Sequence, residues 1–215
     1  MKLKHRVTKR RHAGQLFAAV AMVFCGATVQ AATVCYPFDN IEGKTFAPGD
    51  QKQFDKALIT FYEYYNEAGD QVPGGNASVK NSGIIGEPPV LSLSSRILVQ
   101  VIPEQRIRRV TLDYAENKGT DNNQIVNLGI NNEIKAWRGT LYKLNGKKLG
   151  QKDYGGLVNI SVTQHPHAGG SDWVEGRLTL QADPAHPNLP DRGISRFAVG
   201  RSSQLQIDNV CLETF

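Results

Sequence analysis

The sequence offers few side chains that could do chemistry together. Glu63 and Asp113 lie in strand-like segments, and two carboxyl groups about 5 to 10 Å apart are what a glycoside hydrolase uses. The motifs of serine hydrolases, zinc proteases and phosphate-binding loops are missing from the chain. We therefore expect a protein that is not an enzyme, with a two-carboxylate glycan hydrolase as the catalytic alternative.

Histidines give a weak indication of a metal site. His165 and His167 form an H-x-H pair near Asp172, with His186 further along the chain, and imidazoles are common zinc ligands. A proline separates the pair within a glycine-rich stretch, so a solvated loop is the alternative interpretation. The oxygen-rich stretch 116–123 lacks the ligand spacing of a helix-flanked calcium loop, and a polar turn explains it.

Residues 1–31 are predicted to be a signal peptide. Basic residues precede an apolar run from Leu16 to about Val29, and small residues precede a cleavage site after Ala31. The apolar run is shorter than the roughly 20 residues that a transmembrane helix needs. We therefore expect a secreted or periplasmic protein of residues 32–215, with no membrane span after cleavage.

Cleavage of the signal peptide would change the net charge. The whole chain has 25 basic and 20 acidic residues, a net charge of +5. Six basic residues and no acidic residue lie before residue 32, which leaves 19 basic residues against 20 acidic ones. Because nucleic acids and anionic membranes select strongly basic surfaces, we expect no nucleic-acid partner.

Two of the three cysteines lie near the ends of the predicted mature chain. Cys25 falls within the signal peptide, whereas Cys35 and Cys211 remain. In an oxidising compartment an even pair of cysteines favours a disulfide. A metal-binding pair and two free thiols are the alternatives, and the spacing supports neither. The bridge would make the first and last strands neighbours.

The remainder of the chain has the pattern of β-strands. No segment after residue 31 keeps a helical hydrophobic period over three turns, and glycine and proline interrupt the chain often. The segments rich in β-branched and aromatic residues are 57–65, 89–93, 97–102, 106–114, 124–130, 133–144, 147–150, 157–163, 173–180, 194–199 and 205–212. Asn145-Gly146 predicts a tight hairpin between 141–144 and 147–149. These features predict one all-β domain, an antiparallel β-sandwich or barrel.

Both ends of this domain resemble a family of secreted bacterial jelly-roll modules. The opening Cys35-Tyr36-Pro37-Phe38-Asp39-Asn40-Ile41-Glu42-Gly43 is similar to the first strand and turn of that family, and Ile207-Asp208-Asn209-Val210-Cys211 is similar to its last strand. The resemblance implies a galactose-binding-like, carbohydrate-binding jelly roll with no catalytic residue. The stretches 163–170 and 182–190 depart from the family pattern, and we expect them to be loops.

The resemblance also implies a structural calcium ion. Asp39 and Asp208 each lie close in sequence to one of the two cysteines, so a bridge would bring both carboxylates to neighbouring strands. Related jelly rolls often hold calcium there, and calcium takes six to eight oxygen ligands. The alternative is that both aspartates cap turns or accept hydrogen bonds from backbone amides.

A glycan-binding surface would need exposed aromatic rings among polar side chains. Trp173 alternates with Glu175 and Arg177 on the polar side of its strand, so these three and Trp137 are the predicted ligand-binding residues. Tyr142 and Tyr154 are weaker candidates. Trp173 could instead cover a sheet edge or fill the core, and the cluster Tyr62, Tyr64 and Tyr65 is expected to be core packing.

These features favour a non-catalytic binding module for carbohydrate or cell-surface glycan. The alternative is a structural or interaction protein of the cell envelope, because the chain is rich in strands and poor in catalytic motifs.

Overall fold

A computed structural model describes residues 31–81, 84–85, 89–117, 123–150, 157–166, 172–183 and 193–215. The predicted signal peptide therefore lies outside the described residues, apart from Ala31. Tyr154, His167 and His186 also lie outside them, as do 118–122 of the predicted polar turn.

The described residues are almost entirely β-strands. The strands are β1 (Thr33–Tyr36), β2 (Thr45–Phe46), β3 (Gln51–Phe54), β4 (Ala57–Tyr65), β5 (Gln71–Val72), β6 (Ala77–Lys80), β7 (Val90–Leu93), β8 (Ile97–Pro103), β9 (Ile107–Asn117), β10 (Ile125–Ile130), β11 (Glu133–Arg138), β12 (Lys148–Gly150), β13 (Leu157–Pro166), β14 (Trp173–Ala182), β15 (Phe197–Arg201) and β16 (Leu205–Thr214). Two short 3-10 helices, η1 (Asp39–Ile41) and η3 (Leu141–Leu144), accompany them. No helix in the described part of the chain is both long and apolar enough to cross a membrane.

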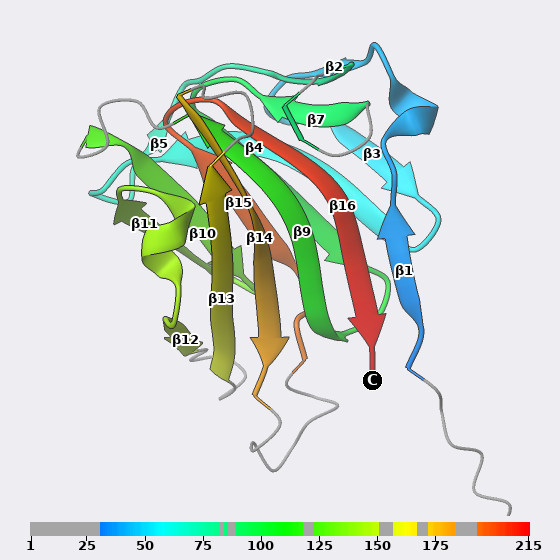
Figure 1. Cartoon of the computed structure of the whole chain (residues 1–215). Coiled ribbons are helices and arrows are strands. Elements are labelled where there is room, and N and C mark those ends of the chain that lie inside the picture. The colour runs from blue at the N-terminus through cyan, green and yellow to red at the C-terminus, as the bar shows by residue number, and fades with distance from the viewer. Residues whose placement is uncertain are drawn as a thin grey trace, which may run out of the picture.

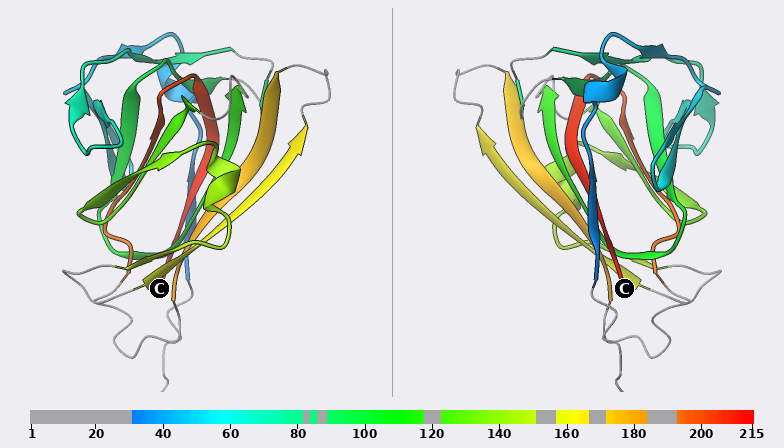
Figure 2. Two further views of the ribbon diagram at one scale, coloured as in Figure 1. Left: turned by 90° about the vertical axis from the view of Figure 1, so that its left-hand side faces the viewer. Right: turned by 90° about the vertical axis from the view of Figure 1, so that its right-hand side faces the viewer.

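The strands form two antiparallel sheets that pack face to face. The nine-stranded sheet has the order β12-β13-β14-β9-β16-β7-β6-β2, with β1 also paired to β16. The seven-stranded sheet has the order β11-β10-β15-β8-β4-β3, with β5 also paired to β4. The nine-stranded sheet faces the viewer in Figure 1, and Figure 2 shows the two layers from the side. The predicted antiparallel β-sandwich is confirmed.

Alternation along the strands decides which side chains enter the core. In β14 the residues Val174, Gly176, Leu178 and Leu180 are buried, while the side chains between them are more exposed. Strand β9 alternates in the same way from Val110 to Tyr114. Successive side chains of a strand point to opposite faces, so each of these strands has one face in the core and one toward solvent. For β14 this confirms that Glu175 and Arg177 lie on the polar side of the strand.

The predicted disulfide is present and joins the two ends of the sandwich. Cys35 and Cys211 are direct partners in the β1–β16 register, with sulfur atoms 2.08 Å apart and Cα atoms 4.0 Å apart. One edge of β16 pairs with β7 through Ile207 and then with β1 from Val210 onward. The bridge therefore attaches β1 where the pairing with β7 has ended.

Residues 141–149 do not form the predicted hairpin. The turn is present, with the Lys147 N–H donating to the Leu144 carbonyl at 3.0 Å. Asn145 has φ −56° and ψ 133° and Gly146 has φ 73°, the geometry of a type II turn, whereas tight hairpins need type I′ or II′. Before the turn the chain forms η3 because Leu141 and Leu144 are both buried, and residues three apart share one side of a 3-10 helix but not of a strand.

The segment from Thr163 to Pro166 is a strand and not the predicted loop. It belongs to β13 and pairs with β14 as far as Pro166, which lies opposite Val174. The pairing places His165 opposite Glu175 on adjacent strands, which local sequence does not reveal.

A buried ion pair connects the two sheets. Glu116 of β9 and Arg201 of β15 are completely buried, and Nη1 of Arg201 lies 3.3 Å from Oε2 of Glu116. The same carboxylate oxygen accepts a hydrogen bond from the Leu141 N–H of η3 at 3.1 Å. This one pair therefore links the nine-stranded sheet, the seven-stranded sheet and the helix at their edge.

Candidate binding sites

Glu175 and Arg177 lie on the outer face of the nine-stranded sheet, as the alternation of β14 predicts. Arg177 is opposite Asp113 of β9 in the register and binds it through two hydrogen bonds, Nε to Oδ1 at 2.6 Å and Nη2 to Oδ2 at 3.0 Å. Asn209 donates a further hydrogen bond to Asp113 Oδ2 at 3.0 Å. Hydrogen bonding to Asp113, with its negative charge, raises the pKa of Arg177. These contacts hold the three side chains in place.

Asp113 and Glu63 do not form the predicted hydrolase pair. Asp113 is on the outer face of the nine-stranded sheet, whereas Glu63 belongs to β4 of the other sheet. Packed sheets lie about 10 Å apart, so the two carboxyl groups are separated by more than the thickness of the core. Both oxygens of Asp113 also hold hydrogen bonds already.

A hollow of about 450 Å³ lies beside Arg177, lined by Ile85, Asp113, Tyr114, Thr163, His165, Glu175, Gly176 and Arg177. Gly176 has no side chain, and a Cβ there would lie 2.0 Å from the Thr163 carbonyl oxygen and 2.8 Å from the Tyr114 hydroxyl. The ring of Tyr114 uses this space, and its hydroxyl donates to the Thr163 carbonyl at 3.1 Å. Burial, with the charge of Glu116, raises the pKa of Tyr114, so the hydroxyl stays a donor.

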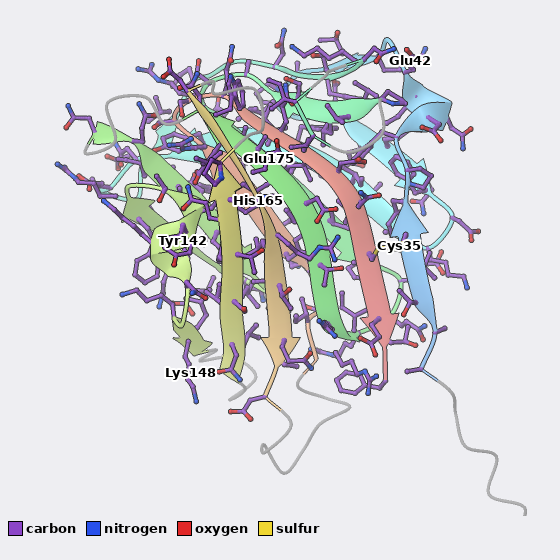
Figure 3. The ribbon with its side chains drawn as sticks, viewed as in Figure 1. Cys35, Glu42, Tyr142, Lys148, His165 and Glu175 are labelled. Carbon is purple, nitrogen blue, oxygen red and sulfur yellow. A yellow bond between two sulfur atoms is a disulfide. The ribbon has the colours of Figure 1, made fainter. Side chains whose placement is uncertain are left out.

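A second hollow of about 280 Å³ is lined by Thr33, Arg109, Thr111, Arg177, Cys211 and Glu213. Because Arg177 lines both hollows, they adjoin on one sheet face, and we call them together the outer groove. Figure 3 labels His165 and Glu175 near one end of this face and Cys35 on β1 at the other side.

Trp173 is not among the residues that line the outer groove. It packs against the small apolar cluster of Ile85, Val90 and Ala115, with Ile84 beside it. This packing matches the alternative interpretation of Trp173 as a cover for part of the sheet. Its role in ligand binding stays a prediction.

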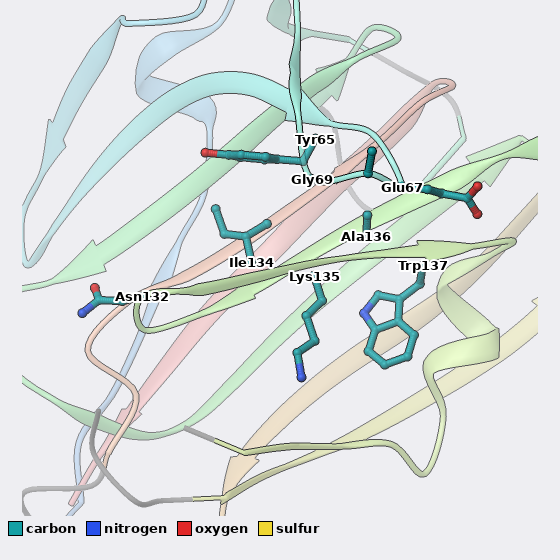
Figure 4. A pocket seen from close by; sticks show the side chains of 9 residues that line it. Tyr65, Glu67, Gly69, Asn132, Ile134, Lys135, Ala136 and Trp137 are labelled. Atoms are coloured by element: carbon teal, nitrogen blue, oxygen red, sulfur yellow. The ribbon is translucent and has the colours of Figure 1, made fainter. Parts of the chain in front are cut away.

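A third hollow, of about 580 Å³, lies on the other sheet between β11 and the turn that joins β4 to β5. We call it the tyrosine cleft; it is lined by Tyr65, Glu67, Ala68, Gly69, Asn132, Ile134, Lys135, Ala136 and Trp137. In Figure 4 the ring of Tyr65 lies on one side and the strand that carries Ile134 and Ala136 on the other.

Tyr65 is held by the side chain of a distant residue. The amide oxygen of Asn127 accepts from the Tyr65 N–H at 2.7 Å, and its Nδ2 donates to the Tyr65 carbonyl at 2.8 Å. Asn127 is fully buried, so both hydrogen bonds are protected from water. The end of β4 is thereby fixed against β10.

The opposite wall of the tyrosine cleft comes from β11 and the turn before it. Ile134 and Ala136 pair with Gly129 and Asn127 in the register. These partners alternate with the core residues Val126, Leu128 and Ile130, so Ile134 and Ala136 point away from the core. Asn131 has a positive φ of 54°, and its amide oxygen accepts hydrogen bonds from the Ser195 N–H at 2.6 Å and the Ser195 hydroxyl at 2.8 Å. These bonds fix the turn that carries Asn132.

The tip of the β4–β5 turn is fixed by an ion pair. Arg138 binds Glu67 through two hydrogen bonds, one of which joins Nε to Oε1 at 2.7 Å. This hydrogen bonding lowers the pKa of Glu67. Asn66 and Asp70 close the turn, with the Asp70 N–H donating to Asn66 Oδ1 at 2.9 Å. All three parts of the cleft wall are therefore positioned before any ligand arrives.

Trp137 lines the tyrosine cleft, although its indole packs elsewhere. It is opposite Val126 in the register and packs against the core, with Lys147 Nζ 5.5 Å from the ring centroid. In Figure 4 the indole points away from Tyr65. Its role in ligand binding stays a prediction.

The sequence predicts core packing for Tyr65 and does not single out Asn132. Tyr64 is buried, but Tyr65 is only partly buried. A signal was available, because Tyr65 is the last strand residue before the polar turn 66–70, where a chain leaves the core.

The structure places the two predicted calcium ligands differently. Asp208 is buried on β16 opposite Asp113, whereas Asp39 is exposed in η1. Within the described ranges, no three His, Cys, Asp or Glu side chains gather as a metal ion would require. The calcium site stays a prediction. A calorimetric titration of the wild type with calcium that gave no binding heat would reject it, and equal binding heats for the wild type and Asp208→Asn would reject Asp208 as a ligand.

Comparison with known proteins adds little to this geometry. No family model matches the chain, and no curated protein matches it. A similar solved structure is that of the K2 cleaved adhesin domain of Lys-gingipain, with a TM-score of 0.37 and 12% identity, over 84% of this chain and 97% of that chain. A likeness of this size carries no functional argument. The fold and the two hollowed surfaces define a disulfide-closed β-sandwich with candidate binding sites on both sheets.

Proposed function

We propose that this protein is a secreted or periplasmic, non-catalytic binding module that binds carbohydrate or cell-surface glycan through the tyrosine cleft. The observation that supports this most is the Tyr65 ring, on a backbone held by Asn127, facing Ile134 and Ala136 with the Asn132 amide at the rim. The jelly-roll resemblance of the chain ends agrees with it.

The composition of the tyrosine cleft suits a sugar ring. The apolar C–H faces of a sugar stack on an aromatic ring, while its hydroxyls need amide and charged partners. The volume of about 580 Å³ is within the roughly 300 to 1,000 Å³ that small-molecule sites occupy. The backbone of two walls is held by the hydrogen bonds of Asn127 and Asn131, so binding needs little rearrangement of the main chain.

The charges of the cleft favour a neutral ligand. Glu67 is paired with Arg138, and Nζ of Lys135 lies 2.9 Å from Oε1 of Glu133. Each rim charge thus has a partner of opposite sign, and these groups offer hydrogen bonds without an excess of either charge.

The proposed location follows from the disulfide and the predicted signal peptide. Disulfides persist in oxidising compartments and are rare in the cytosol. A pair that joins β1 to β16 is consistent with the periplasm or the cell exterior.

The test is a broad array of neutral glycans, followed by affinity measurements with the best binder. We expect Tyr65→Ala to weaken binding by about tenfold or more, if a sugar ring stacks on tyrosine with a free energy similar to the about 1 to 3 kcal/mol of a nucleobase. Tyr65→Phe should bind nearly as wild type. Tyr142→Ala is the matched control, since Tyr142 is 46% exposed and lies outside the cleft.

Two results would reject the proposal. One is an array with no neutral binder, and the other is unchanged affinity in Tyr65→Ala. Stable complexes with an envelope protein, in the absence of any glycan binder, would favour the structural alternative instead.

A further inference from the structure

The hollow at the β1 end of the outer groove contains more positive than negative charge. Arg109 and Arg177 line it, together with the single carboxylate of Glu213. Glu213 is already engaged, because Arg108 Nε donates to its Oε1 at 2.9 Å. Arg177 is engaged with Asp113. The carboxylates of Glu213 and Asp113 are thus matched against three arginines, namely Arg108, Arg109 and Arg177.

Arg109 is the arginine that neither of these carboxylates binds. It is exposed on the outer face of β9, and among the described residues it has no ion-pair or hydrogen-bond partner for its guanidinium. The direct register partner of Arg109 on β16 is Glu213, whose carboxylate binds Arg108. The guanidinium of Arg109 therefore remains available to a ligand.

The side chains around Arg109 can complete an anion site. Thr33 and Thr111 line the same hollow, and their hydroxyls can donate hydrogen bonds. The Cys35–Cys211 bridge holds β1, which carries Thr33, against β16. The Asp113 contacts hold the head of Arg177 on the other side.

We propose that this hollow binds the oxyanion substituent of an acidic polysaccharide, with Arg109 as the main cationic contact. A guanidinium binds a planar carboxylate through two parallel hydrogen bonds and also binds the oxygens of a sulfate ester. The adjoining hollow is lined by the polar residues Thr163, His165 and Glu175, which the next sugar of a chain would contact. The ligand is accordingly a chain and not a free ion.

The hollow around Arg109 is independent of the tyrosine cleft, because the two sites lie on different sheets.

The charge pattern also distinguishes a polysaccharide from a nucleic acid. Nucleic acids bind where several phosphates are neutralised at once, whereas the hollow at the β1 end has one unmatched cation and the adjoining hollow adds the carboxylate of Glu175. A ligand with one oxyanion for each sugar and several hydroxyls fits this pattern better.

The experiment uses the mature chain and two matched pairs of polymers at low and moderate salt. Polygalacturonate is compared with its methyl ester, and dextran sulfate with dextran. We expect at least one charged polymer to bind more tightly than its neutral counterpart, and the stronger pair identifies carboxylate or sulfate. The binding should weaken with salt, because exposed charges are screened.

Arg109→Ala should weaken binding of the charged polymer by about tenfold or more, as expected for the loss of hydrogen bonds between charged groups. Arg109→Lys should recover part of this loss, since lysine keeps the positive charge but lacks the paired N–H donors of the guanidinium. Lys44→Ala removes one exposed cation elsewhere and is the matched control. Melting temperatures of all variants show that folding is unchanged.

Three results would overturn the inference. They are equal binding of the charged and neutral polymers, unchanged affinity in Arg109→Ala, and equally tight binding of a short DNA duplex at the same salt. Because neutral polymers report on the tyrosine cleft, a failure here is distinguishable from a failure of the proposed function.

Discussion

Gly176 leaves room for the ring of Tyr114 on the core side of the nine-stranded sheet. A Cβ at this position would lie 2.0 Å from a backbone oxygen of β13, and two paired strands cannot separate locally without losing hydrogen bonds. Gly176→Ala should therefore destabilise the fold by about 2 to 4 kcal/mol, through overpacking and loss of the Tyr114 hydrogen bond.

Urea unfolding of Gly176→Ala measures this cost. Ser161→Ala on β13 is a suitable control, because Ser161 is exposed on the neighbouring strand. A Gly176→Ala protein as stable as the wild type would mean that β13 and β14 are not packed as described.

Tyr64 gives the stability a dependence on alkaline pH. Burial, the largest cause, raises the pKa of Tyr64 from 10.0 to about 12; Glu67 also raises it, while Ser202 and Arg96 lower it. The unfolded chain ionises first as the pH rises, so the contribution of Tyr64 is complete below pH 10 and decreases up to about pH 12.

The free energy of unfolding, measured in urea from pH 8 to 12, should fall less steeply in Tyr64→Phe than in the wild type. Tyr65→Phe is the control, because it removes a hydroxyl from the adjacent, less buried residue. Parallel pH profiles for wild type and Tyr64→Phe would contradict the prediction.

The pairing of strand β1 should depend on the disulfide, because the strand is short and has one pairing partner in the described part of the chain. It has four residues and pairs with β16 alone among the described strands. Removing a native disulfide from a small exported domain costs about 2 to 5 kcal/mol. We expect the double variant Cys35→Ser with Cys211→Ser to lose stability in this range and to expose the amides of β1.

Hydrogen exchange checks this locally, because the β1 amides should lose protection while those of β9 keep it at moderate temperature. The wild type with the bridge intact is the control. Equal protection of β1 in both proteins would show that strand pairing holds this edge without the bridge.

Richness in β-branched and aromatic residues was enough to predict the long strands, whereas the short strands β2, β3, β5 and β6 were missed. The bounds of β4 match the prediction, and β9 and β14 follow it closely, because each has one face in the core. Strands β2 and β5 have two residues each, too few for any periodic signal. Their strand character comes from partners elsewhere in the chain.

The candidate sites were predicted only where they follow from a single strand. The outward orientation of Glu175 and Arg177 is a property of β14 alone. Their neighbour Asp113 comes from the register with β9, and the position of Tyr65 depends on Asn127, 62 residues away. Spacing along the chain contains neither relation.

The whole sandwich is connected by the buried pair of Glu116 and Arg201. Both side chains are completely buried, and Arg201 is among the largest side chains without exposed surface. Arg201 Nη1 also donates to the Asn117 carbonyl at 2.6 Å. Removing one member of a buried ion pair leaves the other charge without compensation, which costs about 3 to 5 kcal/mol, whereas replacing both with apolar residues can be neutral.

Arg201→Met and Glu116→Leu should therefore each destabilise the protein by about 3 to 5 kcal/mol, and the double variant by much less than their sum. Urea unfolding of the four proteins in a double-mutant cycle measures the coupling between them. Loss of the pair should also weaken the contact of η3 with β9, because the Leu141 N–H donates to Glu116. Additive effects of the two substitutions would mean that the sheets are held together by apolar packing and that the ion pair contributes no coupling.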